Sequence, residues 1–463
     1  MNEKKLLIFI CIFFLLTRVY KIWEIPPSVY WDEASIGYNA YSILKTGKDE
    51  WGEFLPLHFR AFGEFKLPVY IYSVVPFIQL FGFNEFSVRF PAVLFSLGVV
   101  ILTYLLAKRL SNNWQVGLFA GFFVSISPWF FIFSRTGFEA TAGLMFYLLG
   151  VYLFLSNVKN GVMVFLSVAS FILSAYSYNS FRIIIPFMFF ILILLERNNL
   201  KEVFRKQIRW VILSLTFIIL SIWPIYRLFI YDVGFFRLQA VGAVDRTTFI
   251  KNYFPHFSLD FLLNGDKNLR HQQGGFGQVY FPDIALIILS FIYMLKSRVK
   301  YRWLPLILIL IAPIPASLTR ESPHALRAIS AVPFVSILSA MGLVYIKKKI
   351  IEAVVLLIFL ALFINYFVNF LTIYPDKSAK DWQYDYKQVF DYVNKKIFTD
   401  PNLGERGDKI YISDEGGQPY IFALFYLKYD PQNFRDEVVR NSVDKWGFST
   451  VKSFGKFEFM GER

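Results

Sequence analysis

Cysteine, histidine and acidic residues are scarce in this sequence of 463 residues. Cys11 is the single cysteine, so no disulfide can form within the chain. There are four histidines, and 34 acidic residues stand against 48 Lys and Arg, for a net charge of +14. The GxxxxGKS/T and helix-opening GxGxxG fingerprints of nucleotide-binding proteins are both absent, and we find no internal repeats. The sequence therefore gives no support for a nucleotide-binding enzyme or a repeat protein.

Charge of either sign is also low, and apolar residues take its place. Only 18% of the residues are charged, whereas 56% are hydrophobic and 20% are aromatic. Such values exceed those of soluble globular domains and indicate a polytopic membrane protein. The positive charge does not indicate nucleic-acid binding, because Lys and Arg cluster in short loops between apolar segments, as the positive-inside rule describes.

Eleven apolar segments predict membrane spans. They are approximately residues 4–22, 88–107, 114–132, 138–156, 161–178, 181–196, 210–230, 281–296, 302–318, 325–345 and 350–372. The first segment starts like a signal peptide, but no small-residue cleavage site follows, so we interpret it as a retained anchor. The basic loops place the N-terminus inside and the C-terminus outside. Residues 68–82 are too short to span and are expected to lie along the outer interface.

This topology predicts a transmembrane domain over residues 1–373 and a C-terminal extracytoplasmic region, a small α/β region, over 374–463. The first outer loop covers residues 23–87, and a long, ordered outer loop covers 231–280. Within the C-terminal region we expect a strand at 409–413 and helices at 387–396 and 420–427. All four histidines fall in predicted outer segments, so the polar chemistry gathers on one face.

The stretch Tyr30-Trp31-Asp32-Glu33-Ala34 opens the first outer loop. Two adjacent carboxylates beside a bundle of apolar helices are unfavourable unless they face water, a cavity or a ligand, which makes them functional candidates. The alternative is that both are solvent-exposed loop acids.

Three passages resemble the GT-C glycosyltransferases, membrane enzymes that take sugars from polyprenyl-phosphate donors. The first is Asp32-Glu33 after the first span. The second is similar to motifs of the protein mannosyltransferase and aminoarabinose-transferase branch; it consists of Phe65-Lys66-Leu67-Pro68 and the passage from Gly82 to Pro91. The third is Ser127-Pro128-Trp129, with Arg135 and Glu139 in the next outer turn. The chain departs from the branch pattern at Leu67, where proline is usual, and Glu64 stands one residue further from Lys66 than the branch motif has it.

The resemblance implies an all-α transmembrane fold and a sugar transferase that works without a catalytic metal or other cofactor. It also implies that Lys66 contacts the donor phosphate. From the chemistry, we expect Asp32 to be the base that takes the proton of an acceptor hydroxyl, with Glu33 orienting Asp32 or the acceptor. Cations at the outer face stabilise a leaving phosphate, and Arg327 and His324 at the start of a span, together with Arg60, are the further candidates.

Additional substrate-binding candidates are polar residues of the predicted outer segments. They are Arg135, Glu139, Arg182, Asp266, Arg270 and His271. For each cation the alternative is an interface anchor or a salt bridge. Asp32, Glu33, Asp266 and His271 could supply hard ligands to a metal ion, but no spacing motif supports one, and we expect none.

The predicted function is transfer of a sugar from a polyprenyl-phosphate donor to a hydroxyl of a protein, glycan or lipid. The reaction would occur at the extracytoplasmic face of the cell membrane, in assembly of the cell envelope or in protein glycosylation. Two alternatives share the architecture: a flippase for a lipid-linked glycan, and an oligosaccharide ligase. A flippase is expected to carry intramembrane charge pairs and repeats, and the sequence shows neither.

Overall fold

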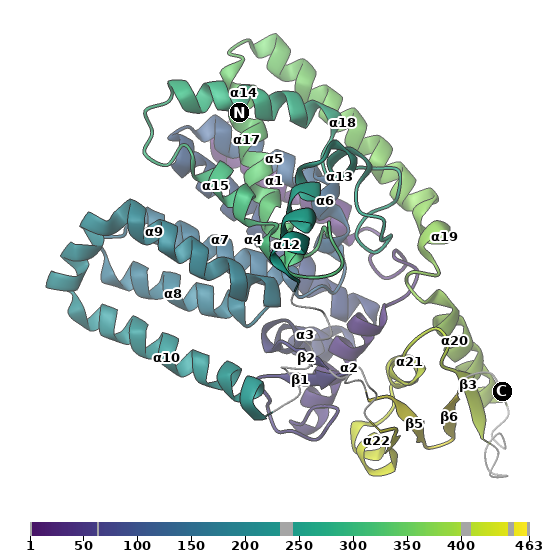
Figure 1. Ribbon diagram of the computed structural model, residues 1–463. Coiled ribbons are helices and arrows are strands. Elements are labelled where there is room, and N and C mark those ends of the chain that lie inside the picture. Colours follow the sequence, from purple (N-terminus) through teal and green to yellow (C-terminus); the bar gives the residue numbers. More distant parts are fainter. Residues whose placement is uncertain (1, 63, 232–243, 400–408, 443–448, 461–463) are drawn as a thin grey trace. The chain divides into compact units, whose positions relative to one another are not determined.

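The computed structural model describes residues 2–62, 64–231, 244–399, 409–442 and 449–460 of a predominantly helical chain (Figure 1). Contacts divide it into two compact units. The first unit comprises residues 1–20, 92–225 and 242–372, and the second comprises 21–91, 226–241 and 373–463. The first outer loop predicted from the sequence thus shares a unit with the C-terminal region.

The first unit is built of apolar helices, since a backbone in lipid has to satisfy its hydrogen bonds internally. Its long helices are α1 (Glu3–Val19), α5 (Trp114–Ile126), α7 (Ala140–Ser156), α8 (Gly161–Ala175), α9 (Asn179–Lys206), α14 (Phe281–Lys296), α17 (Val332–Tyr345) and α18 (Lys349–Thr372). Its short helices are α6 (Pro128–Phe131), η1 (Phe133–Arg135), α12 (Arg246–Tyr253), η2 (Phe254–Phe257), α13 (Leu259–Asn264), α15 (Leu304–Ile311), α16 (Ile314–Ser317) and η3 (Ile329–Ala331). Helices α4 (Glu85–Ser111) and α10 (Ile208–Tyr231) contribute to both units.

Close helix pairs form the core of the first unit. Helices α7, α8 and α9 lie side by side, and α14 packs along α17 (Figure 1). The α14–α17 contact depends on Gly342, because a Cβ there would stand 1.9 Å from the carbonyl oxygen of Leu286. A small residue at the crossing lets the two backbones approach closely, as in membrane helix pairs generally.

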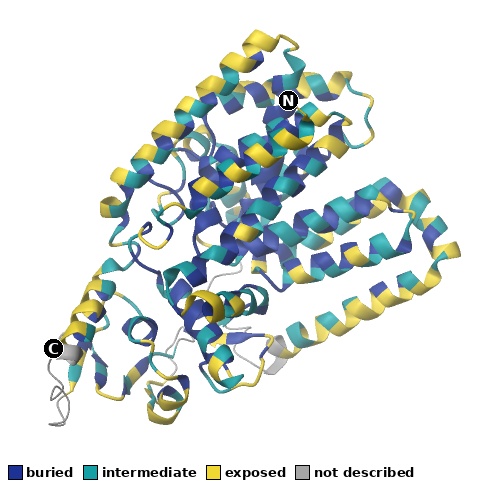
Figure 2. Ribbon diagram, turned by 180° about the vertical axis from the view of Figure 1, so that it is seen from behind, coloured by how far each residue is buried: buried dark blue, intermediate teal, exposed yellow. Residues whose placement is uncertain are grey.

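Each of the eleven predicted spans overlaps at least one helix. Among the described residues, α4, α9, α10 and α18 are long and apolar enough to cross a membrane, and α5 with Pro128–Arg135 would be a fifth span, bent by 62°. Many residues of α10 and α18 are exposed (Figure 2), and they include large apolar residues, as expected for lipid-facing helices. The protein is therefore a multi-pass membrane protein, while the number eleven stays a prediction.

Breaks in the helices fall within or at the end of two predicted spans. Helix α9 breaks at Glu196, where the predicted span 181–196 ends, and a second helical stretch follows to Lys206. The Glu196 carboxylate binds Lys300 and Tyr301. The segment 302–318 divides into α15 and α16 around Pro313. Proline lacks the N–H that a continuous helix requires, so the division follows from the sequence.

The second unit combines short helices with two small sheets. Its helices are α2 (Trp31–Thr46), α3 (Pro68–Phe81), α19 (Tyr374–Ser378), α20 (Tyr384–Thr399), α21 (Pro419–Tyr426) and α22 (Pro431–Glu437). Strands β1 (Phe59–Ala61) and β2 (Glu64–Lys66) form a hairpin. Strands β3 (Ile410–Ser413), β4 (Val439–Arg440), β5 (Val451–Phe454) and β6 (Phe457–Met460) form a sheet in the order β3-β6-β5-β4.

These elements confirm that 68–82 is a helix and that the C-terminal region contains α and β structure. The sequence prediction missed α22 and the hairpin β5–β6, which turns at Gly455 with a φ of 51°. Helix α2 is central to the second unit, packing on α3 and α21. At Gly37 an added Cβ would stand 2.7 Å from Val88 and 2.9 Å from Phe425, so a larger residue there would push these elements apart.

The predicted sidedness can be tested with cysteines at the exposed positions Lys45, Lys159 and Lys452. In a background with Cys11→Ala, we expect an impermeant thiol reagent added to intact cells to label Lys45→Cys and Lys452→Cys. We expect Lys159→Cys to react only after permeabilisation, because its loop is basic and predicted to be cytoplasmic. Labelling at position 159 in intact cells would contradict the topology.

Candidate functional site

Asp32 and Glu33 lie in the first turn of α2, so they are helical residues and not loop acids. Carboxylates are favoured in this turn because the helix dipole is positive there. Glu33 also accepts a hydrogen bond from the backbone N–H of Tyr30, at 3.3 Å, and so caps the helix. The helix thus fixes the direction of both side chains.

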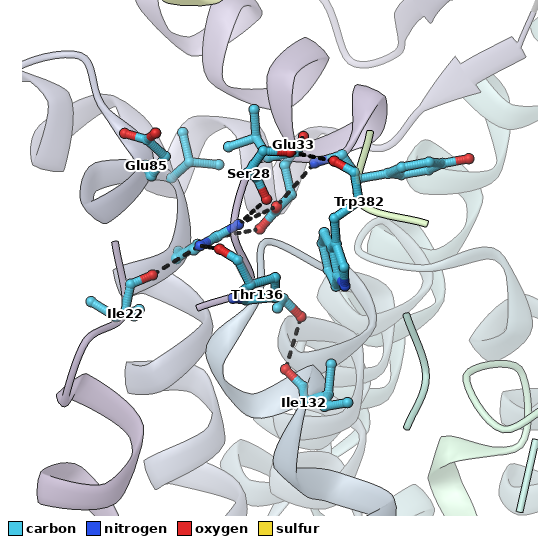
Figure 3. Close-up of polar contacts among 12 residues, drawn as sticks. Ile22, Ser28, Glu33, Glu85, Ile132, Thr136 and Trp382 are labelled. Atoms are coloured by element: carbon cyan, nitrogen blue, oxygen red, sulfur yellow. Dashed lines mark hydrogen bonds and ion pairs between the residues drawn. The ribbon is translucent and has the colours of Figure 1, made fainter. Parts of the chain in front are cut away.

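Glu33 forms a buried ion pair with Arg89 near the start of α4. The Arg89 Nε and Nη2 atoms each lie 3.1 Å from one carboxylate oxygen of Glu33. The guanidinium also donates to the carbonyls of Ile22 at 2.9 Å, Pro26 at 3.0 Å and Ser28 at 2.5 Å (Figure 3). Both side chains are almost fully buried, which is tolerated because the charges are paired and their hydrogen bonds are made.

The C-terminal region forms hydrogen bonds with the segment that leads into α2. The Ser28 hydroxyl donates to the Trp382 carbonyl, and the Trp31 N–H donates to Gln383 Oε1 at 3.2 Å. Figure 3 shows Ser28, Glu33 and Trp382 grouped together. The backbone that leads into α2 is therefore held by Arg89 on one side and by residues 382–383 on the other.

Asp32 forms an ion pair with Lys66, a contact that the sequence analysis did not predict. Lys66 Nζ lies 2.5 Å from Asp32 Oδ1. Lys66 ends strand β2, and Pro68 then begins α3, so the hairpin and the helix together fix its position. The Lys66 side chain is 5% exposed, while that of Asp32 is 32% exposed and open to an incoming group.

The hairpin does not bring Arg60 to this pair. In the β1–β2 register Lys66 stands opposite Phe59, whereas Arg60 stands opposite Phe65. Cross-strand partners share a face and successive residues alternate, so Arg60 and Lys66 occupy opposite faces. The Arg60 guanidinium lies 5.1 Å from the ring centre of Trp51.

Asp266, His271 and His324 form a separate cluster in the first unit. Asp266 Oδ2 lies 2.7 Å from His271 Nδ1 and accepts the N–H of Ala325 at 3.0 Å. The rings of His271 and His324 have centres 4.6 Å apart. Burial opposes ionisation of Asp266, but the hydrogen bond from His271 holds its pKa well below the ordinary value. Burial, with the nearby charges of His271 and Arg327, lowers the pKa of His324.

His324 and Arg327 lie in the turn at the start of the predicted span 325–345. They precede η3 and α17, which begin at Ile329 and Val332. Arg327 donates to Thr319 Oγ1 at 2.7 Å and to Glu321 at 3.2 Å. Its guanidinium therefore stabilises the turn formed by residues 319–327.

Asp266, His271 and His324 present ligand atoms within 4.8 Å of one another, a spacing that a metal ion can bridge. Several of these atoms already have partners. Asp266 Oδ2 accepts from His271 and Ala325, and His324 Nδ1 accepts the N–H of Arg327 at 3.3 Å. As it stands, the cluster joins the 264–272 loop to the segment that precedes α17.

Two further sequence candidates bind helix ends. The buried Arg135 donates to the carbonyls of Thr17 at 3.3 Å and Tyr20 at 2.9 Å, and Arg182 donates to the Ala175 carbonyl at 3.0 Å. Cations at the carbonyl end of a helix are stabilised by its dipole. These contacts to backbone carbonyls are neither of the two alternatives considered for the cations, an interface anchor and a salt bridge.

The last two candidates lie at turns. Glu139 directly precedes α7, and Arg270 Nε donates to Asn268 Oδ1 at 3.3 Å. The nearby Gly274 and Gly275 have φ of 70° and 85°, as in a turn. Residues 232–243 of the long loop lie outside the described residues.

Sequence reasoning missed the roles of Arg89 and of the C-terminal region. Arg89 was present in the motif that resembles the mannosyltransferase branch, and this motif was the available signal. Gln383 and Trp382 gave no local signal, because they lie about 350 residues from their partners.

Glu50 is another buried carboxylate of the second unit, which also contains α2. It accepts a hydrogen bond from the Tyr420 hydroxyl at 2.9 Å, and Arg440 Nη1 lies 3.7 Å away. Burial raises the pKa of Glu50 to about 7, although the charge of Arg440 opposes this. Glu50 therefore changes charge near neutral pH.

This pKa predicts that folding stability depends on pH. A carboxyl with a higher pKa in the folded state binds protons more tightly when folded, so stability falls as pH rises from about 5 to about 7. The difference between 4.5 and about 7 corresponds to about 3 kcal/mol. We expect Glu50→Gln to flatten the dependence of the unfolding temperature on pH, and the exposed Glu415→Gln to leave it unchanged. An equal pH dependence in Glu50→Gln and wild type would contradict the assignment.

Part of the chain is similar to a known protein family. Residues 66–226, about a third of the chain, match the model of the dolichyl-phosphate-mannose-protein mannosyltransferase family. The matched segment begins at Lys66 and includes Arg89. No curated protein sequence matches the chain.

Solved structures share its fold at low sequence identity. ArnT from Cupriavidus metallidurans bound to undecaprenyl phosphate aligns with a TM-score of 0.50 and 14% identity over 71% of this chain and 59% of its own. The oligosaccharyltransferase AglB from Archaeoglobus fulgidus, with an inhibitory peptide and a dolichol-phosphate, aligns with a TM-score of 0.53 and 14% identity. That alignment covers 92% of this chain and 63% of AglB. The chain therefore shares the fold of these two membrane transferases, and its residues 66–226 are similar to the dolichyl-phosphate-mannose-protein mannosyltransferase family.

Proposed function

We propose that this protein transfers a sugar from a polyprenyl-phosphate donor to a hydroxyl of an acceptor at the extracytoplasmic face of the cell membrane. The observation that carries the proposal is the Asp32–Lys66 pair, in which a partly exposed carboxylate lies 2.5 Å from a buried lysine. The ArnT structure holds undecaprenyl phosphate and the AglB structure a dolichol-phosphate, which supports a lipid-linked donor for this protein.

The pair provides the two groups that the reaction requires. Asp32 takes the proton of the acceptor hydroxyl as the oxygen attacks the anomeric carbon of the sugar. The bond between that carbon and the phosphate oxygen breaks, and the polyprenyl phosphate leaves with the electron pair. Lys66 stabilises the charge that develops on this phosphate, and a buried ammonium does so more strongly than one in water.

Glu33 and Arg89 act as positioning residues in this proposal. Their ion pair fixes the first turn of α2, which carries Asp32, against the start of α4. A base held in one geometry needs no reorganisation when the acceptor arrives. The orienting role predicted for Glu33 is thus exerted through the backbone.

Lys66→Ala is expected to weaken binding of a short-chain polyprenyl-phosphate sugar by about 1.5–3 kcal/mol, the scale of hydrogen bonds to charged groups. Titration of the purified variant with the analogue measures this, and the exposed Lys45→Ala serves as the control. Wild-type affinity in Lys66→Ala would remove Lys66 from the phosphate site.

Arg327 and His324 remain proposed phosphate ligands, and the same titration tests them. Arg327→Ala should weaken donor binding to a similar extent, and Arg327→Lys should recover only part of it, because a lysine cannot grip two oxygens. If Arg327→Ala lowers thermal stability but leaves donor affinity unchanged, Arg327 only stabilises its turn.

A vesicle assay separates this function from the alternatives. Reconstituted vesicles with a radiolabelled polyprenyl-phosphate monosaccharide and an envelope extract should transfer label to an acceptor. A flippase would change only the side on which the label lies. The second candidate is an oligosaccharide ligase, because AglB aligns over 92% of this chain. A ligase would use a lipid-linked oligosaccharide and not the monosaccharide.

A further inference from the structure

The second unit contains a cavity of about 450 Å³ beside the segment that leads into α2. This volume lies within the range of about 300–1,000 Å³ that is typical of small-molecule sites. Its walls come from the segment before α2, the start of α4, and helices α19 and α20. The residues relevant to binding are Trp23, Glu24, Glu85, Asp376, Tyr384 and Lys387. None of them has a role in the chemistry proposed above.

The lining combines two aromatic rings with polar groups. Trp23 is 50% exposed, and its indole N–H donates to Glu24 Oε1 at 3.1 Å, which holds the side chain at the cavity. Tyr384 is partly exposed at the start of α20. Half-exposed aromatic rings present an apolar face with a polar edge, the surface that matches the C–H face and hydroxyls of a sugar ring.

The charges of the lining indicate which ligands fit. The lining carries the three carboxylates of Glu24, Glu85 and Asp376 and the ammonium of Lys387. Outside the lining, Lys21 Nζ lies 3.1 Å from Glu24, so the carboxylates still exceed the ammonium groups by one. Lys387 Nζ lies 2.8 Å from Glu85 and donates to the Pro27 carbonyl at 3.4 Å. Like charges would repel a phosphate, so the cavity does not suit the donor headgroup. The carboxylates can instead accept hydrogen bonds from hydroxyl groups, and the lysine can donate hydrogen bonds to them.

The cavity lies next to the network that positions Asp32. Glu85 stands one helical turn before Arg89 on α4, and Arg89 binds Glu33, the neighbour of Asp32. Figure 3 shows Glu85 beside this network. Pro27 in the cavity wall is five residues from Asp32. A ligand in the cavity would therefore lie within a few side chains of the proposed base.

We propose that this cavity binds neutral sugar units of a glycan acceptor, one of whose hydroxyls reacts at Asp32. The proposal rests on the proposed transferase function and adds to it the class of acceptor. Trp23 and Tyr384 provide stacking surfaces, and Glu24, Asp376 and the Lys387–Glu85 pair bind hydroxyls. The donor phosphate and the acceptor glycan would thus be recognised by groups of opposite charge.

The test measures binding of defined tetrasaccharides to the purified full-length protein by native mass spectrometry and titration. Neutral mannotetraose, cellotetraose and chitotetraose are compared with anionic tetragalacturonate and with the cationic tetramer of glucosamine. We expect at least one neutral tetrasaccharide to bind at millimolar concentrations and tetragalacturonate to bind about tenfold more weakly or not at all. Trp23→Ala should lower the affinity for the neutral ligand by about five- to tenfold, and Trp23→Phe should keep most of the wild-type affinity.

Matched variants complete the test. Asp376→Asn should weaken binding of the neutral ligand, whereas Asp385→Asn, an exposed acid on α20 outside the lining, should not. Binding is measured without any donor, so failure of the transferase proposal would leave this result intact. Absence of binding by all three neutral ligands, binding of the cationic tetramer alone, or wild-type affinity in Trp23→Ala and Asp376→Asn would overturn the proposal.

Discussion

Asp32→Asn is expected to lower the rate of sugar transfer by at least about 100-fold, the lower end of what a positioned acid–base group contributes. Asparagine keeps the shape of the side chain but cannot take a proton from the acceptor. The protein should stay folded, because Asp32 is partly exposed and its partner Lys66 retains a nearby oxygen acceptor. The turnover number should fall while the affinity for the donor changes little.

Two comparisons make this prediction specific. Asp32→Glu keeps a carboxylate on a longer side chain and should recover part of the rate, whereas Asp385→Asn replaces an exposed acid elsewhere and should be fully active. Steady-state transfer and donor titration on the same preparations separate the two effects. A turnover number equal to that of wild type would exclude Asp32 as the base. Loss of donor binding would assign it to substrate binding.

Arg89→Met should have the largest effect on stability. It leaves the carboxylate of Glu33 buried without its cation and removes the donor to three carbonyls. Breaking a buried ion pair by removing one partner costs about 3–5 kcal/mol. Transfer activity should fall as well, because the first turn of α2 loses its attachment to α4.

A double-mutant cycle distinguishes the ion pair from general packing. Glu33→Gln with Arg89→Met should be less destabilising than the sum of the single changes, since no unpaired charge remains. Arg246→Met, at an exposed position on α12, is the matched control and should be neutral. Unfolding monitored by fluorescence in nanodiscs measures the effect. Additive single effects, or a neutral Arg89→Met, would contradict the positioning role.

The long apolar helices of the first unit could be predicted because composition alone requires them, whereas α12 and α13 fall in a segment that was predicted as a loop. A segment such as 350–372 contains almost only apolar residues, and in lipid only a helix satisfies its backbone. Asp32 and Lys66 could each be chosen as candidates, since both belong to short motifs that resemble a known family, but their ion pair could not be predicted from the sequence. Breaks inside a span were less predictable, as the division of the segment 302–318 into α15 and α16 shows.

The remainder depends on contacts between distant parts of the chain. Arg135 and Arg182 resemble substrate-binding cations in sequence, yet each donates to carbonyls at the end of a neighbouring helix. The attachment of Trp31 to Gln383 joins residues 352 positions apart. Periodicity and motif spacing report local structure, so neither pattern could reveal these contacts.

The measurement that most directly tests the central claim is the release of free polyprenyl phosphate, followed by mass spectrometry. Purified wild-type protein in vesicles receives a polyprenyl-phosphate monosaccharide and an envelope extract as the source of acceptor. Our account predicts that polyprenyl phosphate forms in step with a glycosylated acceptor, and that Asp32→Asn forms at least about 100-fold less in the same time. An intact donor with wild-type protein, or equal release by Asp32→Asn, would contradict it.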